Sequence, residues 1–268
     1  STASIPFALT MVGFAIGNGV MGRIVDHYGI TKTIILAAII NTLGYIAAMQ
    51  VNNVYLLSIL QFFIGFGTAA SFGPLIADTS HWFLKRRGIA VALIASGNYF
   101  SGAIWPPLFN SALQSDGWRD VYGILALATI FIMIPLSFLL TKKISEETSR
   151  ASDAASEDRR ASVNISPRML TILLSIAGVG CCVAMSMPQV HIVAFCIDLG
   201  YGPAVGAEML SLMLIGGIIS RLINGLLADK LGGVYTLLIG STLQCIALFL
   251  YLPFDGLVSL YIVSAVFG

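Results

Sequence analysis

Long apolar runs separated by short polar segments dominate the hydrophobic pattern of this chain. A membrane-spanning helix needs about 20 largely apolar residues, because each residue adds about 1.5 Å against a hydrocarbon core of roughly 30 Å. The runs are long and do not alternate, so they predict helices rather than barrel strands. Nine spans are predicted, at residues 3–22, 33–51, 54–77, 88–112, 119–141, 168–196, 205–227, 234–253 and from 257 onward.

The composition agrees with this pattern. Of the 268 residues, 57% are hydrophobic and 10% are charged, and the mean hydropathy is +0.90, whereas about a quarter of the residues in a soluble domain are charged. We therefore predict an all-α, multi-pass protein surrounded by a lipid bilayer, and we expect that membrane to be the plasma (cell inner) membrane. The chain begins without Met and ends inside an apolar run, so we expect it to be incomplete at both ends.

The basic residues indicate the orientation. Cytoplasmic loops of membrane proteins collect Lys and Arg, and alternate loops of this chain hold 12 of its 14 Lys and Arg residues. We interpret the Lys85-Arg86-Arg87 cluster as an interfacial anchor, and we expect no nucleic-acid partner. The predicted cytoplasmic loops are residues 23–32, 78–87, 142–168 and 228–233.

Segment 142–167 differs from the other loops because it is small, polar and charged, with few large apolar residues. Such a composition cannot bury a core. We predict that it is a cytoplasmic linker between an N-terminal helical half at 1–141 and a C-terminal helical half at 168–268.

A polar pattern recurs at a shift of 203 residues. The same shift aligns Gly13 with Gly216 and Thr33 with Thr236. We predict two parallel repeats with a site between them, an architecture known among transporters. The pattern is G-x-x-x-D-x-x-G in a short cytoplasmic loop, formed by Gly22, Asp26 and Gly29 and again by Gly225, Asp229 and Gly232.

These six residues are predicted to form a conformational gate. Glycines allow close helix approach and a sharp reversal. Each aspartate supplies a charge that can pair across the cytoplasmic face in one conformation and release in another. The alternative is an interfacial turn with no gating role.

Arg221 is the strongest candidate for a substrate-binding residue. It lies eight residues before Asp229, or about 12 Å of helix from the cytoplasmic loop. A charged side chain at that depth costs at least a few kcal/mol, and a guanidinium matches a carboxylate. An anionic substrate is thus the predicted partner, and a structural ion pair is the alternative.

Other polar residues within the spans are weaker candidates. The repeat pairs Asn18 with Arg221 and Asn41 with Gln244, which suggests a polar pathway. His191 follows Pro188 and is either a proton-binding group or an interfacial hydrogen-bonding residue. Either substrate binding or helix–helix contact explains the others. The predicted substrate-binding set is Arg221, Asn18, Asn98, Tyr99, His191 and Gln244.

The sequence offers no pattern for a cofactor, a metal ion or enzymatic catalysis. The chain has three distant histidines and no HExxH, GxSxG or GxxxxGK[ST] motif. We predict that its cysteines are buried small hydrophobic residues rather than metal ligands. These are Cys181, Cys182, Cys196 and Cys245.

The two G-x-x-x-D-x-x-G loops resemble the signature of the major facilitator superfamily between spans two and three and between spans eight and nine. The resemblance implies a bundle of two pseudo-symmetric helical halves, of which this chain covers spans two to ten of twelve. His27 and Ile30 replace basic residues that usually follow the first aspartate, whereas Lys230 is kept after the second.

Within that superfamily, segment 82–90, with Gly97 and Gly102 after it, resembles the monocarboxylate and oxalate–formate carriers. The resemblance implies that Arg221 is the span-eight arginine that binds the substrate carboxylate. Monocarboxylate carriers have an aspartate one turn earlier, where this chain has Gly217.

The expected function is therefore secondary active transport of small organic anions, monocarboxylates foremost, by alternating access. Proton symport and anion exchange are both open, so a proton is a possible second partner. The alternatives are transport of another small solute and a transporter-like sensor that binds without moving its ligand.

Overall fold

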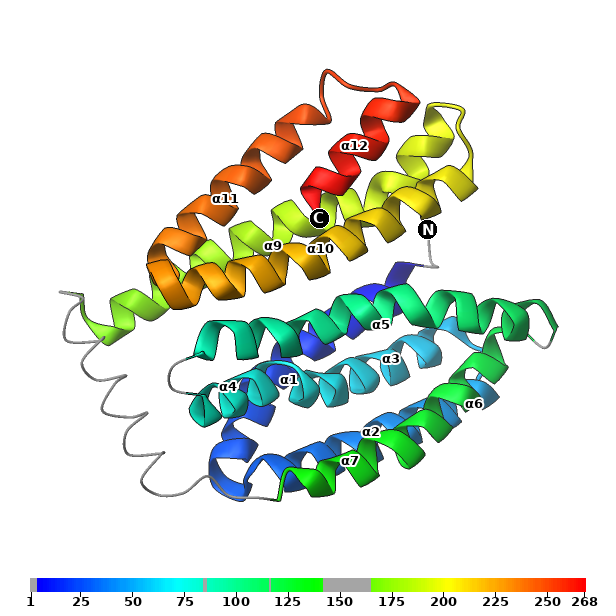
Figure 1. Ribbon diagram of the computed structural model, residues 1–268. Helices are drawn as coiled ribbons and strands as arrows, with labels where there is room; N and C mark the ends of the chain where they lie inside the picture. Colours follow the sequence, from blue (N-terminus) through cyan, green and yellow to red (C-terminus); the bar gives the residue numbers. More distant parts are fainter. Residues whose placement is uncertain (1–3, 84–85, 116, 142–164) are drawn as a thin grey trace. The chain divides into compact units, whose positions relative to one another are not determined.

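The computed structural model describes residues 4–83, 86–115, 117–141 and 165–268, and every regular element in these ranges is a helix (Figure 1). The elements in chain order are α1 (Ile5–Tyr28), α2 (Ile30–Gln50), α3 (Val54–Thr68), η2 (Ala69–Ser71), α4 (Gly73–Trp82), α5 (Arg87–Ser115), α6 (Trp118–Ala128), η3 (Thr129–Met133), α7 (Ile134–Leu139), α9 (Pro167–Asp198), α10 (Pro203–Leu231), α11 (Gly233–Leu250) and α12 (Leu257–Phe267).

The predicted all-α membrane class is confirmed, and each predicted span falls on helix. Seven helical stretches of the described chain are long and apolar enough to cross a bilayer; α5, on the span predicted at 88–112, is not among them, and α12 is a shorter apolar helix. The span predicted at 54–77 is divided into α3, η2 and α4, and the span predicted at 119–141 contains the π-helical turn η3. Hydropathy gives the length of a span but not these local changes in helical winding.

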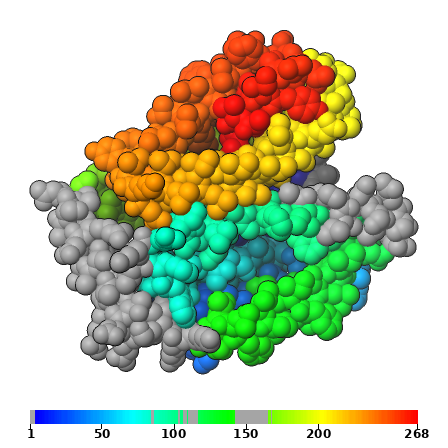
Figure 2. Space-filling model, viewed as in Figure 1, coloured from blue at the N-terminus to red at the C-terminus, as the bar shows by residue number. Residues whose placement is uncertain are grey.

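Large apolar side chains cover much of the helix surface. Val234 on α11 is 71% exposed, and Val258 on α12 is also 71% exposed. In Figure 2 these two helices, orange and red, form an outer surface of their part of the chain. Such a surface suits contact with lipid, since monomeric soluble proteins rarely expose large continuous apolar patches.

The predicted gate loops are helix ends rather than loops, which corrects the sequence interpretation. α1 continues to Tyr28 and α10 to Leu231, so Asp26 and Asp229 lie in the last helical turns. The apolar run ends where the predicted bilayer ends, but backbone hydrogen bonding carries the helix further.

A single glycine joins the helices at each gate. Gly29 has φ 84° and ψ 162°, and Gly232 has φ 85° and ψ 161°. A side chain at either position would strain the backbone, because only glycine adopts these angles readily.

The hydrogen bonds around the two glycines also match. The hydroxyl of Thr33 donates to the carbonyl of Gly29 over 2.9 Å, and the hydroxyl of Thr236 donates to the carbonyl of Gly232 over the same distance. The repeat inferred from spacing therefore recurs in local geometry.

The repeat extends to a pair of close helix crossings. A Cβ atom on Gly13 of α1 would collide with the carbonyl oxygen of Phe62 on α3, and a Cβ on Gly65 with that of Thr10. At a shift of 203 residues, a Cβ on Gly216 of α10 would lie 2.9 Å from the carbonyl oxygen of Ala265 on α12. Small residues let membrane helices approach this closely.

The chain separates into two compact units. The first contains residues 1–82 and 105–146, and the second contains residues 83–104 and 147–268. In the first unit α3 packs against α1 and α2, and in the second α10 packs against α9, α11 and α12. The part of α5 up to residue 104 therefore belongs to the second unit, and the rest of the helix belongs to the first. Residues 142–164 of the predicted linker lie outside the described residues, and the domain boundaries stay a prediction.

Candidate functional site

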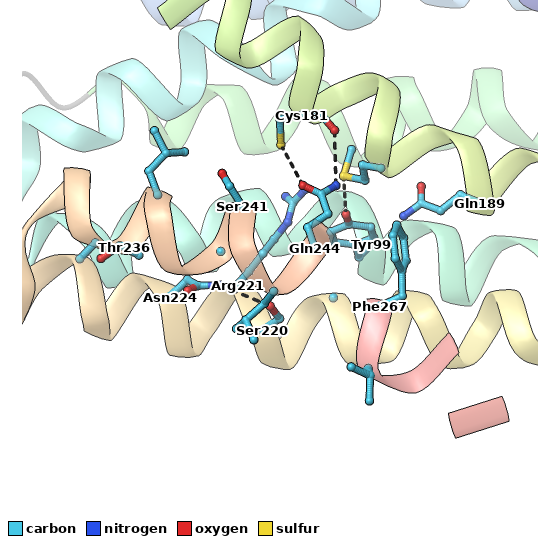
Figure 3. Close-up of a pocket in the computed structure, with 18 of the residues that line it drawn as sticks. Tyr99, Cys181, Gln189, Ser220, Arg221, Asn224, Thr236, Ser241, Gln244 and Phe267 are labelled. Atoms are coloured by element: carbon cyan, nitrogen blue, oxygen red, sulfur yellow. Dashed lines mark hydrogen bonds between the residues drawn. The ribbon is translucent and has the colours of Figure 1, made fainter. Parts of the chain in front are cut away.

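A cavity of about 480 Å³ opens on the second unit (Figure 3). Helices α5, α9, α10, α11 and α12 all contribute to its wall. Arg221 is the one charged side chain among its described lining residues. The polar side chains beside it are neutral: Tyr99, Gln189, Ser220, Asn224, Thr236, Ser241 and Gln244.

Arg221 reaches from α10 to α5. Its Nη1 atom donates to the carbonyl oxygen of Ala95 over 2.7 Å, and its Cζ atom lies 4.1 Å from the centre of the Tyr99 ring. No carboxylate of the described residues pairs with it. A guanidinium carries five N–H donors, so Ala95 leaves most of them for another acceptor.

The α5–α10 contact follows one stripe on each helix. Residues four apart lie on the same helical face, and Gly217, Arg221, Gly225 and Asp229 form such a stripe on α10. A Cβ on Gly225 would lie 2.6 Å from the Cβ of Ala92 on α5. The glycine therefore lets the helices approach closely between the Arg221 and Asp229 contacts.

Asp229 caps the N-terminus of α5. One carboxylate oxygen accepts the N–H of Gly88 over 2.6 Å, and the other accepts the N–H of Ile89 over 3.0 Å. Free N–H groups and the helix dipole favour a negative charge there. The partners of this aspartate in the structure are therefore backbone donors.

Replacing Asp229 with Asn is expected to destabilise the protein by about 1 kcal/mol, because the amide loses the charge and one of two acceptor atoms. Thermal unfolding of the purified protein in detergent measures this effect. Lys230→Gln changes an exposed charge one residue away and should cost no more than about 0.5 kcal/mol. Equal losses in the two variants would contradict the capping role.

The first gate differs from the second. Asp26 is exposed, and no partner for it is found among the described residues. Gly22 has open space where a Cβ would project, whereas a Cβ on Gly225 would lie 2.6 Å from the Cβ of Ala92. A gating role for either set of residues stays a prediction.

The structure gathers some of the predicted substrate-binding residues. Arg221, Tyr99 and Gln244 line the cavity, and the Gln244 amide lies 3.5 Å from the carbonyl of Cys181 (Figure 3). Asn98 and His191 are exposed and do not line it.

Asn18 lies in the other unit, where its amide donates to the carbonyl of Phe14 on its own helix over 2.8 Å. The shift of 203 residues that pairs Asn18 with Arg221 reflects the internal repeat. The two residues lie in different units, and Asn18 does not line the cavity of the second unit.

Sequence reasoning did not single out several wall residues. Ser241 lies three residues before Gln244, a spacing that places both on one face of α11. This spacing could have identified Ser241 from the sequence, because Gln244 was already a predicted site residue. Gln189 follows Pro188 on α9, and no spacing in the sequence related it to another residue of the cavity wall.

The cysteine prediction is wrong for three of the four residues. Cys196 is buried, whereas Cys181, Cys182 and Cys245 are exposed. Apolar sequence surroundings in a membrane helix do not distinguish a packed face from an exposed one. No cluster of potential metal ligands occurs among the described residues.

The fold and the site together define a polytopic helical membrane protein with a cationic cavity wall in its spans. A family model described as "Major Facilitator Superfamily" matches residues 1–268. The chain belongs to this family.

Its relatives are named as transporters, which agrees with the prediction that it is not an enzyme. Monocarboxylate transporter 13 of Rattus norvegicus is 24% identical over 269 residues, covering 99% of this chain and 61% of the relative. The MFS-type transporter pytF of Aspergillus terreus is 23% identical over 223 residues, covering 81% of this chain and 72% of the relative. The chain thus spans about three fifths of the length of the rat protein.

A solved structure supports the fold. The proton:xylose symporter XylE, bound to 6-bromo-6-deoxy-D-glucose, matches with a TM-score of 0.67 at 15% identity. The match covers 100% of this chain and 69% of the symporter chain.

Proposed function

We propose that the protein is a secondary active transporter of small organic anions, foremost monocarboxylates, in the plasma membrane. The observation that carries this proposal is the environment of Arg221. Its guanidinium borders a cavity, and its described contacts are a carbonyl dipole and an aromatic ring, neither of which cancels its charge.

The energetic argument concerns a charge within a predicted span. A cation there costs at least a few kcal/mol, and the two neutral contacts offset part of that cost while leaving the charge in place. An anionic solute offsets more, because it adds an opposite charge and a carboxylate can pair with the guanidinium through two parallel hydrogen bonds.

The neutral wall complements this cation. Ser220 and Asn224 on α10 and Gln244 on α11 supply donors and acceptors without an opposing charge. Such a wall suits a solute with one carboxylate and further polar atoms. The name of the rat relative, a monocarboxylate transporter, is consistent with that class.

The contact of Asp229 with α5 supports alternating access. It joins helices from the two halves of the sequence repeat, at the predicted cytoplasmic end. In this proposal the contact holds that end shut and breaks when the site opens to the cytoplasm.

A neutral solute is the second candidate. The xylose symporter has the same fold, and the hydroxyl and amide groups of the cavity also suit a sugar. In that case the role of Arg221 would be structural: it would connect α10 to α5 through its contacts with Ala95 and Tyr99.

Uptake of labelled lactate, pyruvate, formate and oxalate into vesicles that contain the full-length protein tests the proposal. We expect saturable uptake of at least one anion, inhibited by other carboxylates. Stimulation by an inward proton gradient would indicate symport, and stimulation by internal anion would indicate exchange. Uptake of xylose with none of the four anions would overturn the anion assignment.

A further inference from the structure

Tyr99 is enclosed by three helices. It lies on α5 and is only 8% exposed. Its hydroxyl donates to the sulfur of Met185 on α9 over 3.0 Å, and a Cβ on Gly217 of α10 would lie within 3.5 Å of three of its ring atoms. The hydroxyl proton, by which a tyrosine would bind an anion, is thus already donated to Met185.

The ring is occupied by Arg221, whose Cζ atom lies 4.1 Å from the ring centre. We infer that Tyr99 is a positioning residue: it holds the Arg221 guanidinium at the cavity wall by cation–π contact and does not itself bind the solute. This inference rests on the proposed function, since it assigns how the same site presents its charge.

An aromatic ring and a carboxylate hold a cation in different ways. The negative face of the ring attracts the guanidinium but carries no net charge, so the full positive charge remains. The ring contact adds no hydrogen-bond acceptor, so apart from the N–H that donates to Ala95 the guanidinium keeps its donors for another acceptor. Tyr99 therefore fixes the position of Arg221, and the remaining N–H donors of the Arg221 guanidinium stay available for a carboxylate.

The neighbouring positions fit this role. A Cβ on Gly217 would lie 3.3 Å from two atoms of the ring, which is a crowded contact, so glycine gives the ring its place against α10. The carbonyl of Ala95, one turn before Tyr99, holds Nη1. One turn of α5 thus supplies both contacts of the guanidinium.

Kinetics of Tyr99 variants in the full-length protein test the inference, with the best anion of the uptake panel as the probe. Tyr99→Leu should raise KM about ten-fold, as expected for loss of a desolvated cation–π contact, with the maximal rate changed less than about two-fold. Tyr99→Phe keeps the ring and should stay within about two-fold of wild type. Phe100→Leu, at the exposed adjacent position, is the matched control and should not change KM.

Two further variants separate positioning from packing. Tyr99→Met refills the volume without a ring, so it should rescue KM if the residue only packs and should not if the ring holds Arg221. In an Arg221→Gln background, Tyr99→Leu should change KM less than about two-fold, because residues that act as a unit are not additive.

Each failure has its own signature. If Tyr99→Met restores the wild-type KM, or if the effects of Tyr99→Leu and Arg221→Gln add, the positioning role is wrong while the anion site stands. If Arg221→Gln alone transports like wild type, the proposed function itself is wrong.

Discussion

Replacing Arg221 with Gln is expected to lower the transport efficiency of the anion by about 100-fold. Gln keeps a polar side chain with an N–H donor but removes the charge and the guanidinium that donates to the Ala95 carbonyl. A charge-assisted hydrogen bond contributes about 1.5–3 kcal/mol, and each 1.4 kcal/mol is about a factor of ten. Initial uptake rates over a range of anion concentrations measure the effect.

Arg221→Lys is the matched control, because it keeps the charge but not the planar fork. We expect it to retain more transport than Gln, with a loss of about ten-fold. Unchanged uptake in Arg221→Ala, or Gln and Lys variants equal to each other, would show that the charge of Arg221 has no part in binding.

Replacing Gly13 with Ala is expected to destabilise the protein by about 3 kcal/mol, the second large effect. The added methyl group would meet the carbonyl oxygen of Phe62 in the α1–α3 crossing, so the two helices must move apart and lose contacts. Thermal unfolding and the yield of folded protein in detergent both report this loss.

Gly19→Ala provides the comparison on the same helix. No atom lies within 4 Å of a Cβ built at Gly19, and Ala favours helix over Gly by about 1 kcal/mol. This variant should be as stable as wild type or more so. If both variants unfold at the same temperature, the crossing does not limit stability.

The repeat was the most informative signal in the sequence. A fixed shift of 203 residues aligned Gly29 with Gly232, and the structure gives them backbone angles that agree within a few degrees. Spacing predicts such features because a glycine-only conformation restricts the residue type at that position.

The partners of the two key charges could not be predicted from the sequence. Arg221 bonds the carbonyl of Ala95, and Asp229 bonds the N–H groups of Gly88 and Ile89. Backbone groups occur at every residue and leave no mark in the sequence, so only the structure identifies them. The cation–π contact with Tyr99 was missed for a related reason: an aromatic residue in an apolar span is common.

Position along a span also did not predict which side chains border the cavity. Asn98 and Tyr99 are neighbours, yet Tyr99 is buried against α10 while Asn98 is exposed. Adjacent residues on a helix point about 100° apart, so the helical face decides, and the face depends on packing that the sequence pattern did not resolve.

Binding of the best anion of the uptake panel and of its own uncharged amide, each to the purified full-length protein, tests the central claim most directly. The two ligands differ in charge and little in size. We predict that wild type binds the anion at least about 30-fold more tightly than the amide and that Arg221→Gln removes this preference. Equal affinities in wild type, or a preference that survives Arg221→Gln, would contradict the assignment of Arg221 as the anion-binding residue.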